Sequence, residues 1–297
     1  MAQQEQIYNS NNFRPNKKKV LKPPYLCYIL LILLSLYILL PLYIIVITSF
    51  KSLKDASRPD FVWWPSDGIL RVDAYVRAFE QDGVAIVRGL LNSVLYYIPR
   101  TMVALLINLL AAYGYGKLEW RGRDAIFAFL MLTMMIPSTI TMTAYKMFIS
   151  LLGWNNTWYP MVIPSLFGGI GGVFFLRQYV KAIPDDLIGA AKIDGMKEMR
   201  IFFTLVLPLL RAAIVARFIS AFISAYNAYL EALIYLGNNE KNWTIQLVLK
   251  DAMNKYPGEQ YVTMAYTVIG MFPLVIVYIF VQDLIVKGSA ITSGLKG

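Results

Sequence analysis

The sequence predicts an all-α polytopic membrane protein with six transmembrane helices and both termini in the cytoplasm. Of its 297 residues, 58% are apolar and only 15% are charged, whereas soluble domains carry about a quarter charged residues. Six apolar runs reach the length of about 20 residues that a helix needs to cross the hydrocarbon core. The segments between the runs carry a strong charge asymmetry, which fixes the predicted orientation.

The elements are expected in the following order. A polar, basic segment at 1–24 is the predicted cytoplasmic N-terminal tail, and 25–297 form the transmembrane domain. The predicted spans are 25–47, 90–115, 125–152 (interrupted at Pro137), 161–180, 212–236 and 261–286. Two longer loops, 51–89 and 237–260, lie outside. The segment 185–208 lies on the inner face and reads as two short helices joined at Asp194-Gly195, because glycine permits the backbone reversal.

Charge supports this orientation. The segments predicted to be inside (14–22, 117–123, 177–217 and 287–296) hold 17 Lys and Arg, and the inside carries 8 Asp and Glu. The remaining 11 basic and 10 acidic residues fall on the outer segments and span ends. The formal net charge of +10 therefore reflects membrane topology, and nucleic acid is not expected as a partner.

Composition also limits the chemistry. The chain has no histidine, one cysteine (Cys27) and no glycine-rich loop of the GxxxxGK[ST] type. We therefore expect no catalytic residue and no metal site, and any ATP must bind to another subunit. Asp185 and Asp186 follow Pro184, where they suit the first turn of a helix.

The predicted fifth span carries a polar stripe. Residues 217, 220, 224, 227 and 231 are spaced 3, 4, 3 and 4 apart, which places them on one helical face. Polar groups are costly against lipid, so this face should line a translocation pathway or form hydrogen bonds between packed helices. The candidate pathway residues are Ser220, Ser224, Tyr226, Asn227, Tyr229 and Glu231. Glu231 could instead extend to the outer surface. Thr101 and Asn108 in the second span, and the glycines at 168–172, favour close packing, with a bend or gate as the alternative for the glycines.

The segment 185–195, DDLIGAAKIDG, followed by Leu207-Pro208, resembles the EAA loop of binding-protein-dependent ABC importer permeases. The stretches NSVLYYIPRT (from Asn92), FFLRQYVKAIP and VKGSAITSGLKG resemble the carbohydrate, maltose-permease-like members in particular. The resemblance implies the type I ABC importer permease fold in a bacterial inner membrane. It also implies that 185–208 are coupling helices that dock on an ATPase through Ala190, Ala191, Lys192, Asp194, Gly195 and Lys197.

The implied partners are a distinct second permease subunit, a dimer of ATP-binding-cassette ATPases that holds ATP and Mg²⁺, an extracytoplasmic solute-binding protein and the lipid bilayer. The implied cargo is a carbohydrate, more specifically an oligosaccharide. Two positions depart from the family pattern: Gly189 replaces a glutamate, and Tyr226-Asn227-Ala228 replaces a Trp-Asn-Asp stretch. The alternatives are an importer of an acidic sugar or a non-sugar solute, and an ion-coupled secondary transporter, for which Glu231 would be the candidate carboxylate.

Overall fold

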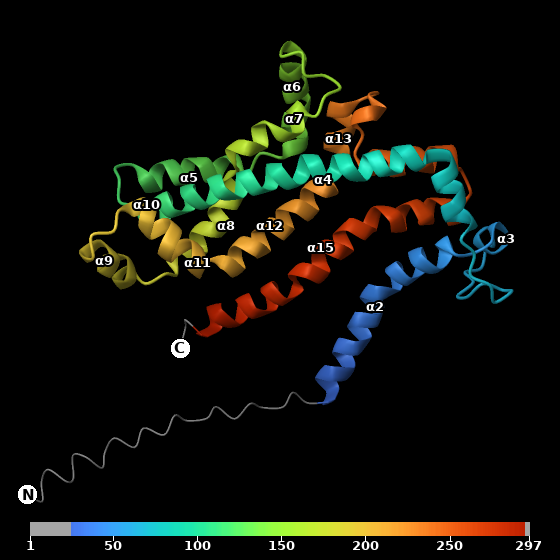
Figure 1. Ribbon diagram of the computed structural model, residues 1–297, viewed down its shortest axis with the longest axis horizontal. Coiled ribbons are helices and arrows are strands. Elements are labelled where there is room, and N and C mark those ends of the chain that lie inside the picture. The colour runs from blue at the N-terminus through green and yellow to red at the C-terminus, as the bar shows by residue number, and fades with distance from the viewer. Residues whose placement is uncertain (1–24, 295–297) are drawn as a thin grey trace, which may run out of the picture. The chain divides into compact units, whose positions relative to one another are not determined.

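The computed structural model describes residues 25–294, and side chains up to residue 282. Every regular element in the described part is helical (Figure 1). The predicted cytoplasmic tail at 1–24 lies outside the described residues. The helices are α2 (Tyr25–Ser49), α3 (Leu53–Ala56), α4 (Asp73–Gly116), α5 (Arg123–Thr133), α6 (Ser138–Leu151), α7 (Tyr159–Val162), η2 (Pro164–Phe167), α8 (Ile170–Lys181), α9 (Asp185–Ile193), α10 (Glu198–Ile201), η3 (Phe202–Val206), α11 (Leu207–Leu209), α12 (Arg211–Tyr226), α13 (Tyr229–Leu236), η4 (Glu240–Asn242), α14 (Ile245–Lys255) and α15 (Gln260–Gly294).

The chain divides into two units, residues 1–44 and residues 45–297. The first contains most of α2, whose side chains from Tyr25 to Tyr43 are exposed on all sides although nearly all are apolar. A helix that is apolar all round and unburied suits a lipid environment. The other unit contains all the remaining helices.

Within the described residues, four helical stretches are long and apolar enough to cross a membrane: Tyr25–Ser49, Asp73–Gly116, Tyr159–Lys181 (α7, η2 and α8 together) and Gln260–Gln282. Two further candidates are bent pairs, α5 with α6 at 90° and the α10–α11 segment with α12 at 77°. The described part of the chain therefore has four to six candidate spans, and the prediction of six is the upper end of that range. The bend before α12 follows α11, which contains Pro208.

The predicted outer loops contain more helix than expected. α4 begins at Asp73, so the prediction of a loop is wrong for residues 73–89, which continue the second span as a polar helical extension. Asp82 has non-helical backbone angles and marks the division between the two parts. Its carboxylate accepts hydrogen bonds from Lys255 (3.1 Å) and Tyr266 (2.6 Å), and Arg77 pairs with Glu259. These contacts to α14 and α15 stabilise the extension.

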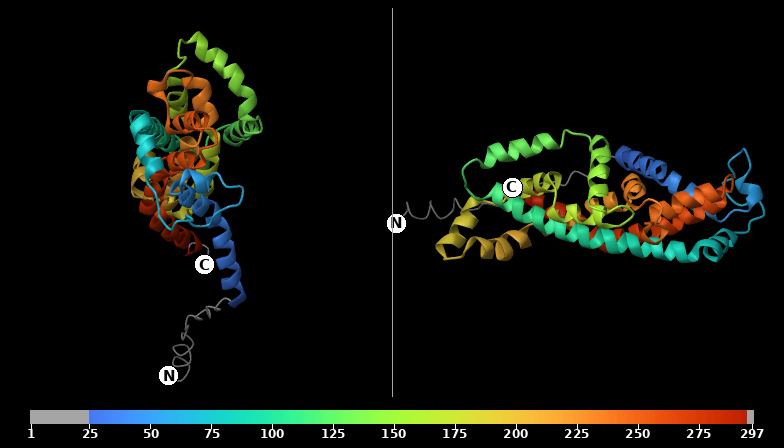
Figure 2. Two further views of the ribbon diagram at one scale, coloured as in Figure 1. Left: turned by 90° about the vertical axis from the view of Figure 1, so that its right-hand side faces the viewer. Right: turned by 90° about the horizontal axis from the view of Figure 1, so that it is seen from above.

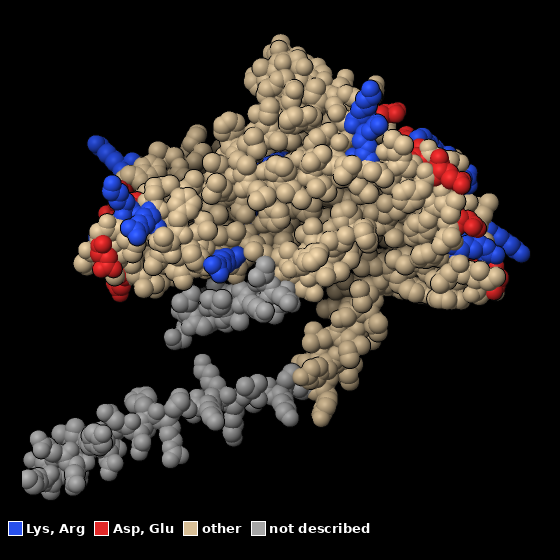
Figure 3. All heavy atoms as spheres, in the orientation of Figure 1, with Lys and Arg blue, Asp and Glu red and all other residues tan. Residues whose placement is uncertain are grey.

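Charged side chains gather at the two ends of the second unit, with a nearly uncharged band between them (Figure 3). One end carries α3 and the start of α4, and the other carries α9 and α10 (Figure 1). α4 extends between these ends. This distribution is typical of a protein whose middle lies in a bilayer.

Two apolar cores pack against α4. One surrounds Tyr97 and includes residues of α12, α14 and α15. The other surrounds Tyr113 and includes α8 together with Ile188, Ala191 and Phe202 of the α9–η3 region. In contrast, α5 and α6 arch away from the other helices (Figure 2), and their apolar side chains are widely exposed, among them Phe129 and Leu151.

The predicted fourth span is broken at its glycines. Gly168 has a φ of +80°, a left-handed conformation that favours glycine, and Gly169 is extended. Asn108 of α4 fills the break, and its side-chain oxygen accepts a hydrogen bond from the Gly169 amide at 2.8 Å. A Cβ atom on Gly172 would lie 2.2 Å from the Asn108 amide nitrogen. The glycines thus provide both of the properties considered from the sequence, a bend and a close helix approach.

We expect Gly172→Ala to lower the free energy of unfolding by about 1–3 kcal/mol, because the added methyl group would displace Asn108 from Gly169. Gly189→Ala is the matched control. It also adds a methyl group to a helical glycine, but nothing lies within 4 Å of the new atom, so a gain of about 0.4–1 kcal/mol is expected. Thermal unfolding of the detergent-solubilised protein measures both. Equal effects of the two variants would contradict the role given to Asn108.

Candidate functional site

The turn at Asp194-Gly195 closes α9 with two specific hydrogen bonds. The Met196 amide donates to the Ala191 carbonyl, and the Gly195 amide donates to the Lys192 carbonyl, both at 3.0 Å. Gly195 has a φ of +77°. This pattern is the Schellman motif, in which a left-handed glycine caps the last carbonyl groups of a helix. The predicted reversal at Asp194-Gly195 is therefore confirmed in its geometry.

The segment from α9 to α11 (residues 185–209) has one buried face and one exposed face. Ile188, Ala191, Ile201 and Phe202 are buried against α4 and α8. The exposed residues include Leu187, Ala190, Lys192, Ile193, Asp194, Gly195, Lys197 and Met199. Of the six predicted coupling residues, five thus lie on the exposed surface and Ala191 packs in the core. Ile193, at 88% exposure, is an apolar side chain that the described part of the chain does not cover.

Lys117 holds the start of the α9–α11 segment near the end of α4. Its side chain is 5% exposed, and its ammonium donates to the Ile183 carbonyl (2.5 Å) and to the Asp185 carboxylate (2.6 Å). The hydrogen bond from Lys117 lowers the pKa of Asp185, so this contact is present at neutral pH and weakens only in strong acid. Asp185 and Asp186 occupy the first turn of α9, where the helix dipole favours acidic groups, as predicted.

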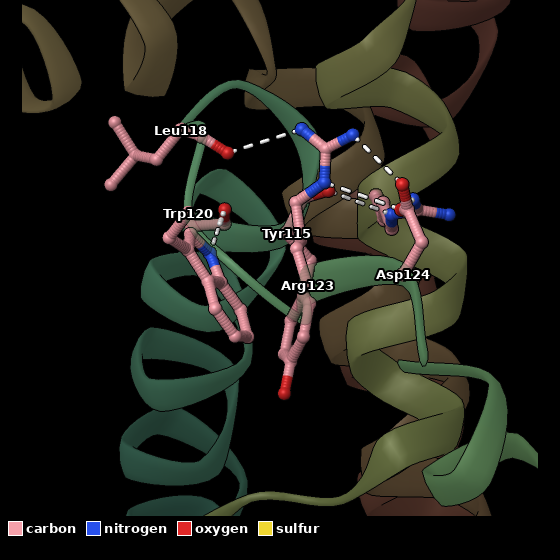
Figure 4. Close-up of polar contacts among 7 residues, drawn as sticks. Tyr115, Leu118, Trp120, Arg123 and Asp124 are labelled. Carbon is pink, nitrogen blue, oxygen red and sulfur yellow. Dashed lines mark hydrogen bonds and ion pairs between the residues drawn. The ribbon is translucent and has the colours of Figure 1, made fainter. Parts of the chain in front are cut away.

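A second attachment comes from the corner between α4 and α5 (Figure 4). Arg123 donates to the Leu118 carbonyl at 3.1 Å and pairs with Asp124. Arg177, a buried residue of α8, donates to the Tyr115 carbonyl at 3.0 Å and pairs with the same Asp124 at 3.2 Å. α8, the helix that leads into α9, is therefore held near its C-terminal end by the corner between α4 and α5.

A cavity of about 390 Å³ lies in the middle of the second unit, between α4, the glycine break and α12–α13. Its volume is in the range of small-molecule sites. Arg100, Asn108, Arg217, Ser220, Ser224 and Glu231 are among its lining residues. Arg100 donates to the Met161 carbonyl at 2.8 Å and pairs with Glu231 at 3.2 Å. Glu231 thus faces inward, and its expected alternative position at the outer surface is not observed.

The other predicted pathway residues lie elsewhere. Tyr226 is fully buried in the core and donates to the Gly270 carbonyl at 2.7 Å, so it does not line the cavity. Tyr229 packs on the same core. Asn227 is exposed, and its side-chain oxygen accepts a hydrogen bond from Gln246 at 3.2 Å. The expected single helical face is interrupted because α12 ends at Tyr226 and α13 begins at Tyr229.

Two residues that line the cavity, Arg100 and Asn108, are not among the pathway residues predicted from the sequence. Arg100 falls among the charges that the sequence places on the outer segments and span ends. Its position within an apolar run is the signal that identifies it as a candidate. Asn108 was assigned to packing, and the structure shows that it both packs and lines the cavity. Among the described side chains, no three His, Cys, Asp or Glu residues are grouped so that they could hold a metal ion.

We expect Lys117→Met to loosen the start of α9, because the Ile183 carbonyl and Asp185 would lose their donor. Hydrogen exchange of the amides at 183–193 should accelerate by about tenfold, which corresponds to the loss of roughly 1.4 kcal/mol of local stability. Lys181→Met serves as the control, because Lys181 is an exposed lysine at the end of α8 that has no ion pair within the described residues. Unchanged exchange in Lys117→Met would refute this anchoring role.

Comparison with known proteins agrees with this geometry. Residues 104–290 match the family model of the binding-protein-dependent transport system inner membrane component. The lactose transport system permease protein LacG of Rhizobium radiobacter is 32% identical over 66% of this chain and 71% of its own. The polygalacturonan/rhamnogalacturonan transport system permease protein YtcP of Bacillus subtilis is 27% identical over 92% of this chain and 97% of its own.

A crystal structure of a bacterial ABC transporter involved in the import of the acidic polysaccharide alginate contains a chain with the same fold. The TM-score is 0.74 at 22% identity, and the match covers 87% of this chain and 95% of that one. The resemblance seen in the sequence is confirmed: the chain belongs to the family of binding-protein-dependent transport system inner membrane components, the multi-pass permease subunits of ABC transporters.

Proposed function

We propose that this chain is a permease subunit of an ATP-driven importer that moves a carbohydrate, an oligosaccharide, across the bacterial inner membrane. The observation that carries the proposal is the α9–α11 segment, which combines an exposed surface with rigid attachment to α4 and α8. The named carbohydrate permeases among the relatives support the cargo class. An extracytoplasmic binding protein would deliver the sugar.

In this proposal the chain crosses the membrane six times, and both termini are cytoplasmic. The bent pairs α5–α6 and α10–α12 then count as spans. The end that carries α9 is the cytoplasmic end, in agreement with the positive charge predicted for the inner segments. Residues 1–24 would form a cytoplasmic tail and 25–297 the permease domain.

The exposed surface of α9, its glycine turn and α10 would dock on an ATP-binding-cassette subunit. Leu187, Ile193 and Met199 offer apolar contact, and Lys192, Lys197 and Asp194 offer charges around it. ATP and Mg²⁺ would bind to a dimer of such ATPases, and this chain would hold no cofactor and catalyse no reaction itself. Closure of the dimer would rotate α9 and, through α8, move the walls of the cavity.

A second, distinct permease subunit would complete the pathway. Its contact surface would be supplied by the apolar side chains of α5 and α6 that lie exposed in the single chain, since contiguous exposed apolar side chains mark protein or lipid contacts. Ser220, Ser224 and Glu231 would line the pathway on this chain's side. Glu231 is the candidate carboxylate for a proton- or ion-coupled carrier. Its ion pair with Arg100 argues against that function, because the carboxylate is already neutralised by the guanidinium.

We expect Gly195→Pro and Asp194→Lys to abolish binding of the ATPase while membrane insertion stays intact. Proline cannot adopt the φ of +77° or donate to the Lys192 carbonyl, and the lysine reverses an exposed charge. Co-purification of the ATPase with the solubilised permease measures the effect.

The matched control is Gly153→Pro. Gly153 also has a positive φ (+69°), donates its amide to a carbonyl three residues earlier and has open space around it, but it lies after α6 rather than after α9. This control should retain the ATPase. Retention of the ATPase by both α9 variants would exclude this segment as the docking surface.

A further inference from the structure

The membrane cavity carries an uncompensated positive charge. Three ionisable residues line it: Arg100, Arg217 and Glu231. Arg100 and Glu231 form an ion pair and neutralise one another. Arg217 has no carboxylate within ion-pair distance and no hydrogen-bond acceptor among the described residues, and its Nε atom is buried. The cavity therefore has a formal charge of +1.

The surroundings of Arg217 offer no substitute for a counter-charge. Asn108 of α4 lines the same cavity, but its side-chain oxygen is already engaged by the Gly169 amide. Gly172 brings the backbone of α8 close to the guanidinium, since a Cβ there would lie 3.4 Å from Nε. Ser220 and Ser224, on the same helix, line the cavity beside it. Structural arginines in membranes pair with carboxylates or backbone carbonyls, and Arg217 does neither.

The sequence groups Arg217 with the inner charges, but in the structure it lies on α12, six residues after the start of the helix, partly buried beside the cavity. A guanidinium held there without a counter-charge is energetically expensive, which favours a functional explanation. The guanidinium is planar and always charged, and its N–H groups form a fork that matches the two oxygens of a carboxylate. A single positive charge is balanced by one carboxylate, whereas a phosphate group would bring about −1.5 to −2. The serines on the same face supply hydroxyl groups of the kind that bind sugar hydroxyls.

We infer that the cavity receives a sugar unit that carries a carboxylate, and that Arg217 binds this carboxylate. The inference rests on the proposed carbohydrate import and makes its substrate class acidic. Arg100 and Glu231 then act as a neutral, fixed wall, and Arg217 provides the discrimination between a uronate and a neutral sugar.

The test measures binding to the detergent-solubilised assembly of this chain with its second permease and ATPase subunits, without the binding protein. Isothermal titration compares galacturonate, which carries one carboxylate, with its methyl ester and with a hexose phosphate. The ester retains the sugar ring and removes the charge. The wild type should bind galacturonate about 10- to 100-fold more tightly than the ester, the range expected for a hydrogen bond to a charged group, and more tightly than the phosphate.

Arg217→Gln should remove this preference, and Arg217→Lys should retain part of it. Arg211→Gln is the control, because Arg211 is an exposed arginine of the same helix that does not line the cavity. The inference is overturned by equal binding of uronate and ester, by absence of uronate binding, or by a preference that survives in Arg217→Gln. It is also overturned if Arg217→Gln releases the second permease subunit, which would show that a protein carboxylate is the counter-charge.

A transport assay distinguishes failure of the proposed importer function from failure of the present inference about its substrate. The complete assembly with its binding protein, reconstituted in vesicles, should import a saccharide only when ATP is supplied. If it imports a neutral oligosaccharide while the cavity does not distinguish uronate from ester, only the present inference fails. If it imports no saccharide with ATP, the carbohydrate importer itself is refuted.

Discussion

The structure depends on the hydrogen bond between Asn108 and the Gly169 amide. A break in a helix leaves amide and carbonyl groups without intrahelical partners, and the interior of a membrane offers no water to satisfy them. Asn108 provides an acceptor from α4 at that depth. Without it, the left-handed turn at Gly168 would expose an unpaired amide, and a continuous helix would be the cheaper conformation. The break is what gives room for the cavity beside α12.

Because of the same break, α8 is a separate helix. It is a helix of 12 residues, about 18 Å long, that starts at the cavity and ends at Lys181, directly before α9. Near its start, a Cβ atom added at Gly172 would meet Asn108 and Arg217, and near its end Arg177 is held by Tyr115 and Asp124. One rigid element thus connects the polar cavity with the exposed surface of α9. In the proposed function, α8 would transmit a rotation of α9 to the cavity, since a packed helix does not deform continuously.

Local sequence patterns predicted the parts of the molecule that local forces determine. The Asp194-Gly195 reversal follows from the conformational freedom of one glycine and two backbone hydrogen bonds within six residues. The apolar runs were located because length and hydropathy suffice for that purpose. The positions of Tyr226 and Glu231 could not be obtained in this way. Tyr226 lies in the core because a carbonyl of α15, 44 residues away, accepts its hydroxyl, and Glu231 faces the cavity because Arg100, 131 residues away, pairs with it.

Position 189 lacks the glutamate of the family motif, and the charges around it show which other carboxylate is free to take its place. Gly189 borders a hollow with Lys117, Asp185, Lys192 and Glu198, and a side chain there would meet nothing within 4 Å. Asp185 is already bound to Lys117, and Glu198 to Lys192 and Tyr113, so neither is free to replace the glutamate. Asp186 and Asp194, by contrast, are exposed and form no ion pair within the described residues. Of these, Asp194 adjoins the glycine turn at the tip of α9, so it is the carboxylate best placed to meet a basic group on a docked partner.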